Sequence, residues 1–294
     1  MKSVRSVTEG LLKSVVTPIT GAVSAMLPLE LTFDTIEDAG VIMGGDVYSV
    51  DDWNTFFELP DNGRVFNVVE VVGTTVNLYG GKNITLKEDL FFDTPHLLGV
   101  DDKIGCVVKL DFGCFAYCVG LTKAKFPSLT EISDQCFNFN QALVDIAFPE
   151  LKTAGGMNFY YCESIVTGNF PKLESAGDHC FDTCSGMVFV NFPLLITAGD
   201  GCFQACTKLA NVNFPALATV GTGCFAECMG LKSLGLPVCT KLGPTNGNDG
   251  VFLNTKNAEF TLTVPSALMT CNAGANDGDI IYAKANNEVT IITV

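Results

Sequence analysis

The chain has 294 residues, of which 48% are hydrophobic and 17% charged, and its 32 acidic residues outnumber the 17 basic ones to give a net charge of −15. Phosphate backbones repel an acidic surface, so the composition argues against nucleic acid as a partner. No apolar run reaches the roughly 18 residues that a membrane-spanning helix requires, which argues against membrane insertion.

Residues 1–27 form the first segment and allow two interpretations. Lys2 and Arg5 precede a mildly apolar stretch, as in a weak signal peptide, but Glu9 and Lys13 interrupt its apolar core. A cleaved signal peptide is therefore the less favoured interpretation.

The alternative for the same segment is a helix. Ser6 and Glu9 have the spacing of a capping box, with serine at the helix start and glutamate three residues later. An apolar stripe at helical spacing follows, formed by Val7, Leu11 and Val15. Because so short a helix is marginal alone, we expect this segment to anchor the chain to assembly proteins or to build a homo-oligomer, with a trimer favoured.

Residues 28–88 are predicted to cap the N-terminal end of the body. Ser49 and Asp52 give another helix-start signal, and the aromatic residues Trp53, Phe56 and Phe57 follow at helical spacing. We expect these rings to cover the open apolar end of the body, since terminal repeats must be capped. A functional aromatic pocket is the alternative.

A fixed 22-residue period dominates the middle of the chain. Cys-Phe pairs begin at 114, 136, 180, 202 and 224, with Asn158-Phe159 filling the one gap, and Phe-Pro pairs begin at 126, 148, 170, 192 and 214. Such a period indicates a solenoid, in which each unit buries its apolar side only against its neighbours.

Within each unit the apolar residues follow the frame L-x-x-L-x-L, as in Leu121, Ala124 and Phe126. The last positions alternate as a short strand does, and proline then ends the strand. Glycine recurs later in the unit, from Gly155 to Gly221, where a turn is expected.

The combination F-x-x-C-x-x-L-x-x-(apolar)-x-F-P-x-L over residues 89–242 resembles the BspA-like leucine-rich repeat family. The resemblance implies a β-rich, right-handed leucine-rich-repeat solenoid with one strand face exposed, used largely for adhesion and recognition. Residues 243–294 are expected to form an irregular last repeat and a C-terminal cap, with a strand pair joined near Asn286 and Asn287.

The thirteen cysteines are the first candidates for chemistry, because C-x-x-x-C recurs in four repeats. Zinc or iron clusters accept such spacing, and disulfides within a repeat are a further alternative. However, Asn140 and Asn158 each replace one cysteine of a pair, which would remove half of such a site. We therefore favour reduced cysteines acting as small buried residues, and expect no metal and no cofactor.

Other catalytic signals are weak. The only histidines are His96 and His179, which gives a nucleophile, histidine and acid set little support. The aspartates Asp134, Asp178 and Asp200 each precede a Cys-Phe position by one residue, where capping a turn explains them better than calcium does.

We expect no enzymatic activity. An enzyme within the irregular N-terminal region, ahead of the repeats, is the alternative, but the acidic residues there show no paired acid and base. These residues are Asp51, Asp52 and Glu58.

The exposed strand face is the first candidate binding site. Between the buried positions, two outward columns are expected to contain Asn169, Asn191, Asn211, Asn213 and Phe189. Neutral amides suit hydrogen bonding to carbohydrate hydroxyls or to a protein edge. The alternative is an amide ladder that only solvates the strands.

A second candidate site lies in the turns, where Tyr117, Phe139, Tyr160 and Tyr161 follow the phenylalanine of each unit. These clustered aromatic side chains suit stacking on sugars or packing against another chain.

Together these features predict a structural or recognition protein. The unclear signal peptide, the anchor-like N-terminus and the cysteine-rich core favour a virion fibre, tail or head decoration protein, assembled in a host cytoplasm and binding a host protein or glycan. The alternative is a secreted or cell-surface adhesin of a bacterium or protist.

Overall fold

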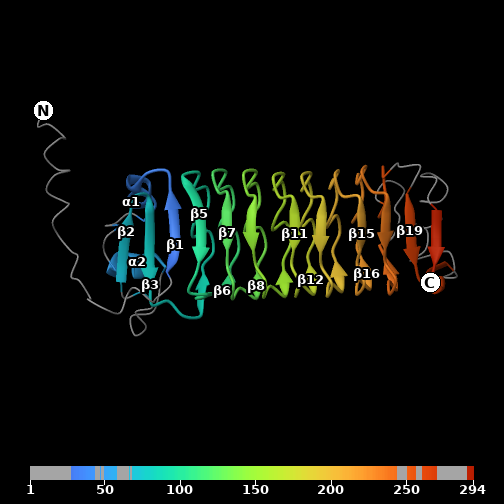
Figure 1. Ribbon diagram of the computed structural model, residues 1–294, viewed down its shortest axis with the longest axis horizontal. Coiled ribbons are helices and arrows are strands. Elements are labelled where there is room, and N and C mark those ends of the chain that lie inside the picture. Colours follow the sequence, from blue (N-terminus) through green and yellow to red (C-terminus); the bar gives the residue numbers. More distant parts are fainter. Residues whose placement is uncertain are drawn as a thin grey trace, which may run out of the picture.

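The computed structural model describes residues 28–43, 47, 50–57, 66, 68–243, 250–255, 260–269 and 290–294. In these ranges the chain winds into an elongated solenoid whose coils stand in a single row (Figure 1). The predicted β-rich leucine-rich-repeat solenoid is thereby confirmed. The stripe Val7, Leu11 and Val15 lies outside the described residues.

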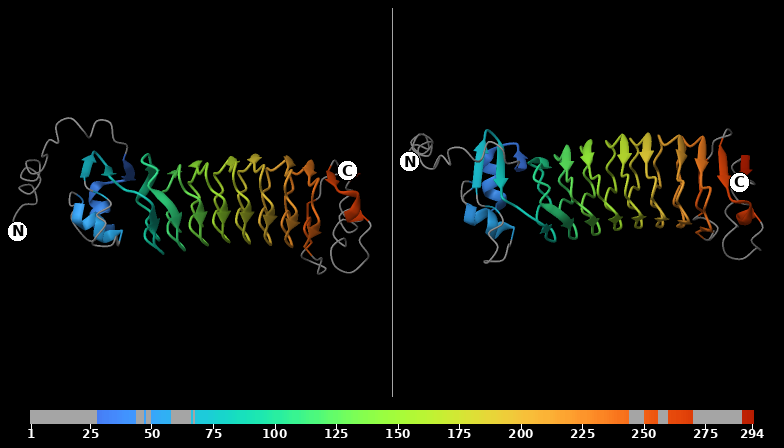
Figure 2. Two further views of the ribbon diagram at one scale, coloured as in Figure 1. Left: turned by 90° about the horizontal axis from the view of Figure 1, so that it is seen from below. Right: turned by 60° about the horizontal axis from the view of Figure 1, so that its bottom comes forward.

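Each coil contributes a short strand to each of the two long sides of the solenoid (Figure 2). The L-x-x-L-x-L frame forms the strands of one side: β7 (Lys123–Lys125), β9 (Asp145–Ala147), β11 (Thr167–Asn169), β13 (Phe189–Asn191), β15 (Asn211–Asn213) and β17 (Ser233–Gly235). Neighbouring strands on this side are parallel, as β15 and β17 show, and each points its middle residue inward. We call the solvent side of these strands the strand face.

The other long side is a continuous parallel sheet of eight strands. Its members are β4 (Ile84–Leu86), β6 (Val107–Leu110), β8 (Glu131–Ile132), β10 (Thr153–Ala154), β12 (Ser175–Ala176), β14 (Thr197–Ala198), β16 (Thr219–Val220) and β18 (Lys241–Leu242). Most of these strands are only two residues long, and a glycine-containing turn follows β10, β12, β14, β16 and β18.

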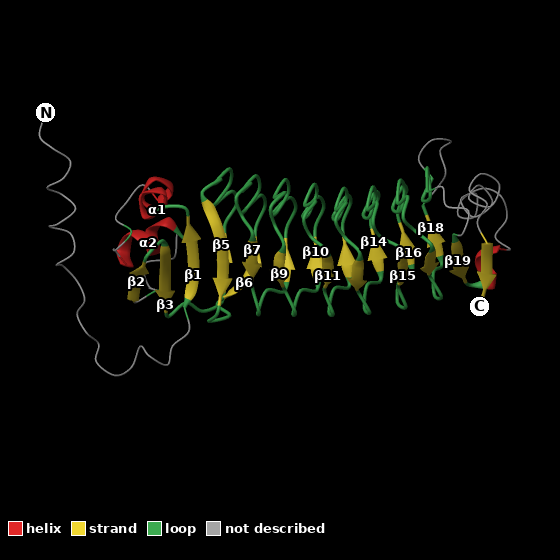
Figure 3. Ribbon diagram, turned by 45° about the horizontal axis from the view of Figure 1, so that its top comes forward, coloured by secondary structure: helices red, strands yellow, loops and turns green. Residues whose placement is uncertain are grey.

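The N-terminal end departs from the repeat. Here β1 (Leu29–Phe33) lies antiparallel to β3 (Thr75–Tyr79) and β5 (Leu97–Asp102), and β2 (Val68–Val72) adds the outer strand. The helices α1 (Ile36–Met43) and α2 (Val50–Phe56) stand beside these strands (Figure 3).

Aromatic side chains of α2 and the residue after it close this end of the core. The Trp53 ring is 1% exposed and donates a hydrogen bond from Nε1 to the Val47 carbonyl oxygen at 2.9 Å. The rings of Phe56 and Phe57 have centroids 5.4 and 6.2 Å from that of Phe91. They cover the first ring of the repeat core, as expected of a lid.

A column of stacked phenylalanines forms the centre of the core. Adjacent rings have centroids 5.1 to 6.2 Å apart and lie within 9° of parallel. The column consists of Phe91, Phe115, Phe137, Phe159, Phe181, Phe203, Phe225 and Phe252. The 22-residue period therefore places one ring per coil at the same depth, as the repeat predicts.

The C-terminal end continues the strand side of the solenoid. β19 (Thr261–Val264) pairs in parallel with β17, and β20 (Thr290–Thr293) pairs in parallel with β19. A short 3₁₀ helix (Ser266–Met269) follows β19. The expected joint near Asn286 and Asn287 lies outside the described residues, so the predicted strand pair there stays a prediction.

Neither helix of the described N-terminal region, nor any other helix in the ranges given above, has the length and apolar character needed to cross a membrane.

Candidate functional site

The strand face has two outward columns of side chains, and from β11 to β20 both columns are uncharged. The outward residues of these six strands are Thr167, Asn169, Phe189, Asn191, Asn211, Asn213, Ser233, Gly235, Thr261, Thr263, Thr290 and Ile292. In a chain with a net charge of −15, a surface of this length without a charge is distinctive.

The same columns are charged in the first coils. Lys123 on β7 pairs with Asp101 on β5, with Nζ and Oδ2 2.5 Å apart, and Lys125 pairs with Asp145 on β9 at 2.7 Å. These ion pairs lie within the strand face itself, so the lysines and aspartates there largely neutralise one another.

Phe189 lies in the middle of the uncharged region. Its side chain is 65% exposed, although neighbouring phenylalanines of the repeat are buried. The backbone N–H of Phe189 donates to the carbonyl oxygen of Val166 on the preceding coil, and the Val166 side chain is itself 50% exposed. An exposed aromatic ring surrounded by neutral polar groups is typical of an interface centre.

The predicted asparagines lie exposed around this ring. Asn191 donates from Nδ2 to Asn169 Oδ1 at 2.8 Å, and Asn211 Oδ1 accepts from Ser233 Oγ at 2.9 Å. An amide ladder therefore exists, but each of these side chains uses only part of its hydrogen-bonding capacity. The ladder hypothesis and the binding hypothesis are compatible.

The aromatic residues of the turns also come together. Tyr117, Phe139 and Tyr161 stack face to face on successive coils, with centroids 4.8 and 5.1 Å apart and planes within 12°. We call these three residues the aromatic ladder. Both faces of Phe139 are covered by its neighbours, so the middle of the ladder exposes mainly ring edges. Tyr160 stands across the ladder, nearly perpendicular to Phe139 and Tyr161.

Every ladder residue has a left-handed backbone, with φ between 58° and 60°. Other coils place Thr183, Ala205 and Glu227 at this position with φ between 53° and 59°, so the coil shape requires the conformation. It costs roughly 1–2 kcal/mol for a residue with a side chain. Ring stacking recovers about 0.5–1.5 kcal/mol per pair, which gives the ladder a structural role as well.

The twelve cysteines in the described ranges are buried and unpaired. The cysteine at the second position of the C-x-x-x-C spacing donates from Sγ to a phenylalanine carbonyl oxygen of the preceding coil. This bond joins Cys118 to Phe91, Cys162 to Phe137, Cys184 to Phe159, Cys206 to Phe181 and Cys228 to Phe203, at 2.9 to 3.2 Å.

Other short donors replace cysteine at this position. Asn140 donates from Nδ2 to the Phe115 carbonyl oxygen at 2.9 Å, and Thr255 donates from Oγ1 to that of Phe225 at 2.7 Å. The sequence predicted burial correctly but missed this role. The signal was present, because cysteine, asparagine and threonine share a short side chain with a donor.

Burial also makes these thiols poor nucleophiles and poor metal ligands. It raises the pKa of Cys118 and of Cys136 to about 12, and thiolate, not thiol, is the reactive form. In the described parts of the chain, no group of three or more histidine, cysteine, aspartate or glutamate side chains is arranged to bind a metal ion.

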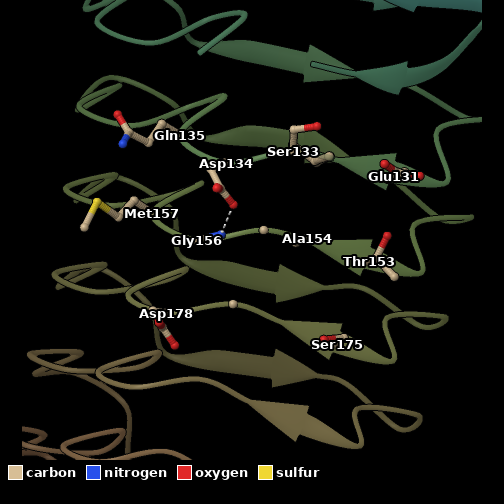
Figure 4. Close-up of a pocket in the computed structure, with 13 residues that line it drawn as sticks. Glu131, Ser133, Asp134, Gln135, Thr153, Ala154, Gly156, Met157, Ser175 and Asp178 are labelled. Atoms are coloured by element: carbon tan, nitrogen blue, oxygen red, sulfur yellow. Dashed lines mark hydrogen bonds between the residues drawn. The ribbon is translucent and has the colours of Figure 1, made fainter. Parts of the chain in front are cut away.

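A shallow groove runs over the eight-stranded sheet. Figure 4 shows its larger part, about 660 Å³, lined by residues of β8, β10 and β12 and the turns after them. Here Asp134 Oδ1 accepts from the Gly156 backbone N–H at 2.7 Å. Asp178 and Asp200 accept in the same way from residues 200 and 222. Each aspartate thus caps the next coil, a structural role in line with the capping prediction.

The polar cluster of His179, Asp182 and Thr183 was not predicted from the sequence. In the turn after Gly177, His179 Nδ1 lies 2.9 Å from Asp182 Oδ2, and Thr183 Oγ1 donates to Asp182 Oδ1 at 2.8 Å. Asp182 is only 5% exposed. The spacing of three residues alone gave no reason to pair these two, because the turn is not a regular helix. His96 instead pairs with Asp34 at the N-terminal end.

Comparison with known proteins identifies the repeat. The family described as "BspA type Leucine rich repeat region" matches six copies over residues 108–232. No curated protein sequence matches the chain.

Three solved structures are similar. A leucine-rich repeat protein from Bacteroides ovatus is 21% identical with a TM-score of 0.49, and the match covers 67% of this chain and 61% of that one. A leucine-rich repeat protein from T. pallidum is 24% identical with a TM-score of 0.43, and the match covers 60% of this chain and 80% of that one. A leucine-rich cell surface protein from Faecalibacterium prausnitzii is 15% identical with a TM-score of 0.33, and the match covers 68% of this chain and 80% of that one. The matched region spans less than two thirds of the Bacteroides ovatus protein. The assignment rests on the match of the repeats themselves: residues 108–232 of this chain are a BspA-type leucine-rich repeat region.

Proposed function

We propose that this protein is a non-enzymatic recognition protein whose strand face, from β11 to β17, binds a partner protein. The observation that carries the proposal is the uncharged region centred on Phe189, with Asn169, Asn191, Asn211 and Asn213 around it. Protein interfaces are depleted of charge at their centre and enriched in aromatic residues, and their strongest contacts cluster around such a residue.

The charged first coils support placing the partner on β11 to β17 and not on β5 to β9. Lysines and aspartates of β5, β7 and β9 pair with one another, so a partner would gain little by replacing those contacts. On β13 and β15, by contrast, the amide groups retain unused donors and acceptors that a partner can bind without displacing an ion pair. The partner footprint therefore lies on the central and C-terminal coils.

A surface-exposed adhesin fits this role better than a virion component. The BspA-type repeats include β11 to β15 of the strand face, and the family resemblance associates such repeats with adhesion and recognition. Nothing among the comparisons supports a fibre or decoration role. The homo-oligomer expected from Val7, Leu11 and Val15 stays a prediction. So does the alternative of an enzyme in the irregular N-terminal region.

The proposal is tested by selecting binders to the immobilised full-length protein from a yeast-displayed library of extracellular domains. Binders of the strand face should lose about thirtyfold in affinity for Phe189→Asp, as expected when an interface centre of ~2 kcal/mol is removed. Met229→Asp is the matched control, because Met229 is 58% exposed in a turn away from the strands. If the selected binders recognise Phe189→Asp as well as the unaltered protein, the proposed face is wrong.

A further inference from the structure

The aromatic ladder ends at Tyr161, and its end differs from its middle. One face of the Tyr161 ring stacks on Phe139, with centroids 5.1 Å apart. On the next coil the ladder position holds Thr183, whose side chain is too small to cover a phenol ring. Among the described residues, Phe139 is the one ring that stacks in parallel on Tyr161, and the Tyr161 side chain is partly exposed.

Tyr160 turns this end into a corner. Its ring lies at 80° to that of Tyr161, with centroids 4.6 Å apart, and at 86° to that of Phe139. Burial raises the pKa of the Tyr160 phenol, and the nearby Asp182 carboxylate raises it further. The corner therefore has two apolar walls on one side and a carboxylate on the other.

The polar side of the corner has a fixed arrangement. Asp182 is buried and accepts hydrogen bonds from His179 Nδ1 and from Thr183 Oγ1. When Nδ1 carries the proton and donates it to Asp182, His179 Nε2 is left as an acceptor. No described residue bonds to Nε2, and the His179 side chain is 36% exposed.

Glycine on the following coil makes room for this arrangement. A Cβ atom at Gly201 would lie 2.5 Å from the His179 ring and 3.2 Å from Gln204 Oε1. The imidazole and the Gln204 amide therefore lie close together over Gly201. They offer one nitrogen acceptor, one carbonyl acceptor and one amide donor within the reach of a small ligand.

We propose that this corner, formed by Tyr160, Tyr161, His179, Asp182 and Gln204, is a binding site for a neutral pyranose, such as the terminal sugar of a glycan. The apolar C–H face of a pyranose packs against an uncovered aromatic ring, and its hydroxyls are donors and acceptors that match His179 Nε2 and the Gln204 amide. Asp182 and the net charge of −15 disfavour acidic sugars. The site is separate from the strand face and does not depend on it.

Saturation-transfer NMR on the full-length protein tests this, with methyl α-mannopyranoside, methyl β-galactopyranoside and N-acetylglucosamine as probes. We expect at least one probe to bind with millimolar affinity and to show transfer to its ring C–H protons. Tyr161→Ala should weaken that binding about tenfold or more, because the stacking face is lost. Tyr117→Ala is the matched control, since Tyr117 has the same side chain and the same left-handed backbone at the other end of the ladder.

A second variant separates binding from folding. Thr183→Tyr adds a ring to the next coil at a position where the fold already accepts tyrosine, so it extends the ladder and covers the open face of Tyr161. It should abolish sugar binding while leaving the thermal unfolding midpoint unchanged or higher. The proposal is overturned if no probe binds up to tens of millimolar, if Thr183→Tyr binds as well as the parent, or if Tyr117→Ala loses binding as strongly as Tyr161→Ala. In any of these cases the ladder only stabilises the turns.

Discussion

The two long sides of the solenoid repeat themselves to different degrees. On the eight-stranded sheet, the four central coils place nearly the same residue outward, Thr153, Ser175, Thr197 and Thr219, and charged residues replace it only toward the two ends of the sheet. On the strand face, the matching outward position changes in every coil: Lys123, Asp145, Thr167, Phe189, Asn211 and Ser233. Both sides are built by the same 22-residue period, so the period alone does not explain the contrast.

Coil packing explains it. On the eight-stranded side, a Cβ atom at Gly177 would lie 2.7 Å from the backbone carbon of Gly155, closer than real Cβ contacts allow. Backbones of neighbouring coils touch there, and Asp178 and Asp200 tie each coil to the next. On the strand face the backbones are also paired, but a Cβ atom at the outward Gly235 would meet only the side chain of Asn213. The contrast indicates that contacts between coils restrict which residues can lie on the eight-stranded side, whereas the outward residues of the strand face can vary to suit a partner.

The largest expected effect concerns the interior that both sides share. Burial raises the pKa of the cysteine thiols above their ordinary value of 9.0, so above that pH the unfolded chain releases protons that the folded chain keeps. The free energy of unfolding should therefore fall as pH rises above 9, by up to ~1.4 kcal/mol per pH unit for each buried thiol. Urea unfolding at a series of alkaline pH values measures this. A midpoint that stays constant would mean that the thiols are not buried.

Phe181→Ala should remove the next largest amount of stability. The ring is fully buried between Phe159 and Phe203, and large-to-small substitutions of this kind cost about 3–5 kcal/mol. Phe189→Ala replaces an exposed ring on the strand face, so it should change the free energy of unfolding by no more than about 0.5 kcal/mol. Denaturant titration of both variants checks the contrast. Equal losses would show that Phe189 is part of the core.

Two glycine substitutions compare the sides directly. Gly177→Ala should cost about 2–3 kcal/mol, because the new methyl group meets the backbone of the preceding coil. Gly235→Ala should cost far less, since its methyl group meets only the movable side chain of Asn213. Thermal unfolding midpoints of the two variants give the test. Similar midpoints would contradict the idea that only one side is fixed by backbone packing.

Cys184→Ala tests the thiol hydrogen bonds. It leaves the buried carbonyl oxygen of Phe159 without its donor and removes little volume, so we expect a loss of ~1.5 kcal/mol. Cys184→Ser keeps a donor of similar size and should restore part of that loss. If alanine and serine destabilise the protein equally, the thiol contributes by packing and not by hydrogen bonding.

The smallest expected effect is an increase in stability. Asn140 Nδ2 donates to Phe115, but its buried Oδ1 has no hydrogen-bond partner among the described residues. Asn140→Cys keeps a donor and removes the unpartnered oxygen, so we expect stability to rise by ~1 kcal/mol. The same denaturant titration measures it. A loss of stability would show that Oδ1 has a partner such as water.

The sequence predicted the solenoid because its evidence is periodic. One ring per repeat unit is visible without a structure, and the Phe159 and Phe181 rings stack as that spacing requires. The N-terminal cap was predicted only in outline. The α2 aromatics had helical spacing, but the antiparallel pairing of β1 with β3 joins residues far apart in the chain and occurs once, so no repetition revealed it.

The candidate sites were predictable to different extents. Columns on the strand face follow from strand alternation, so the exposure of Asn191 and Phe189 could be expected. The pairing of His179 with Asp182 could not, because it depends on two left-handed residues in one turn, at φ 53° and 57°. Side-chain contacts inside irregular turns have no fixed sequence spacing.

The phenylalanine column also has a consequence for the history of the protein. Phe252 stacks on Phe225, and Phe115 stacks on Phe91, although both pairs are spaced more widely in the sequence than the repeat period. The column thus stays continuous although these two spacings are 24 and 27 residues instead of 22. Duplication or loss of a complete unit would likewise preserve every contact and change only the length of the surface, by the ~4.8 Å that separates adjacent strands. Recombination between units is therefore a simple route by which such a gene can lengthen, shorten or reorder the surface that its product presents.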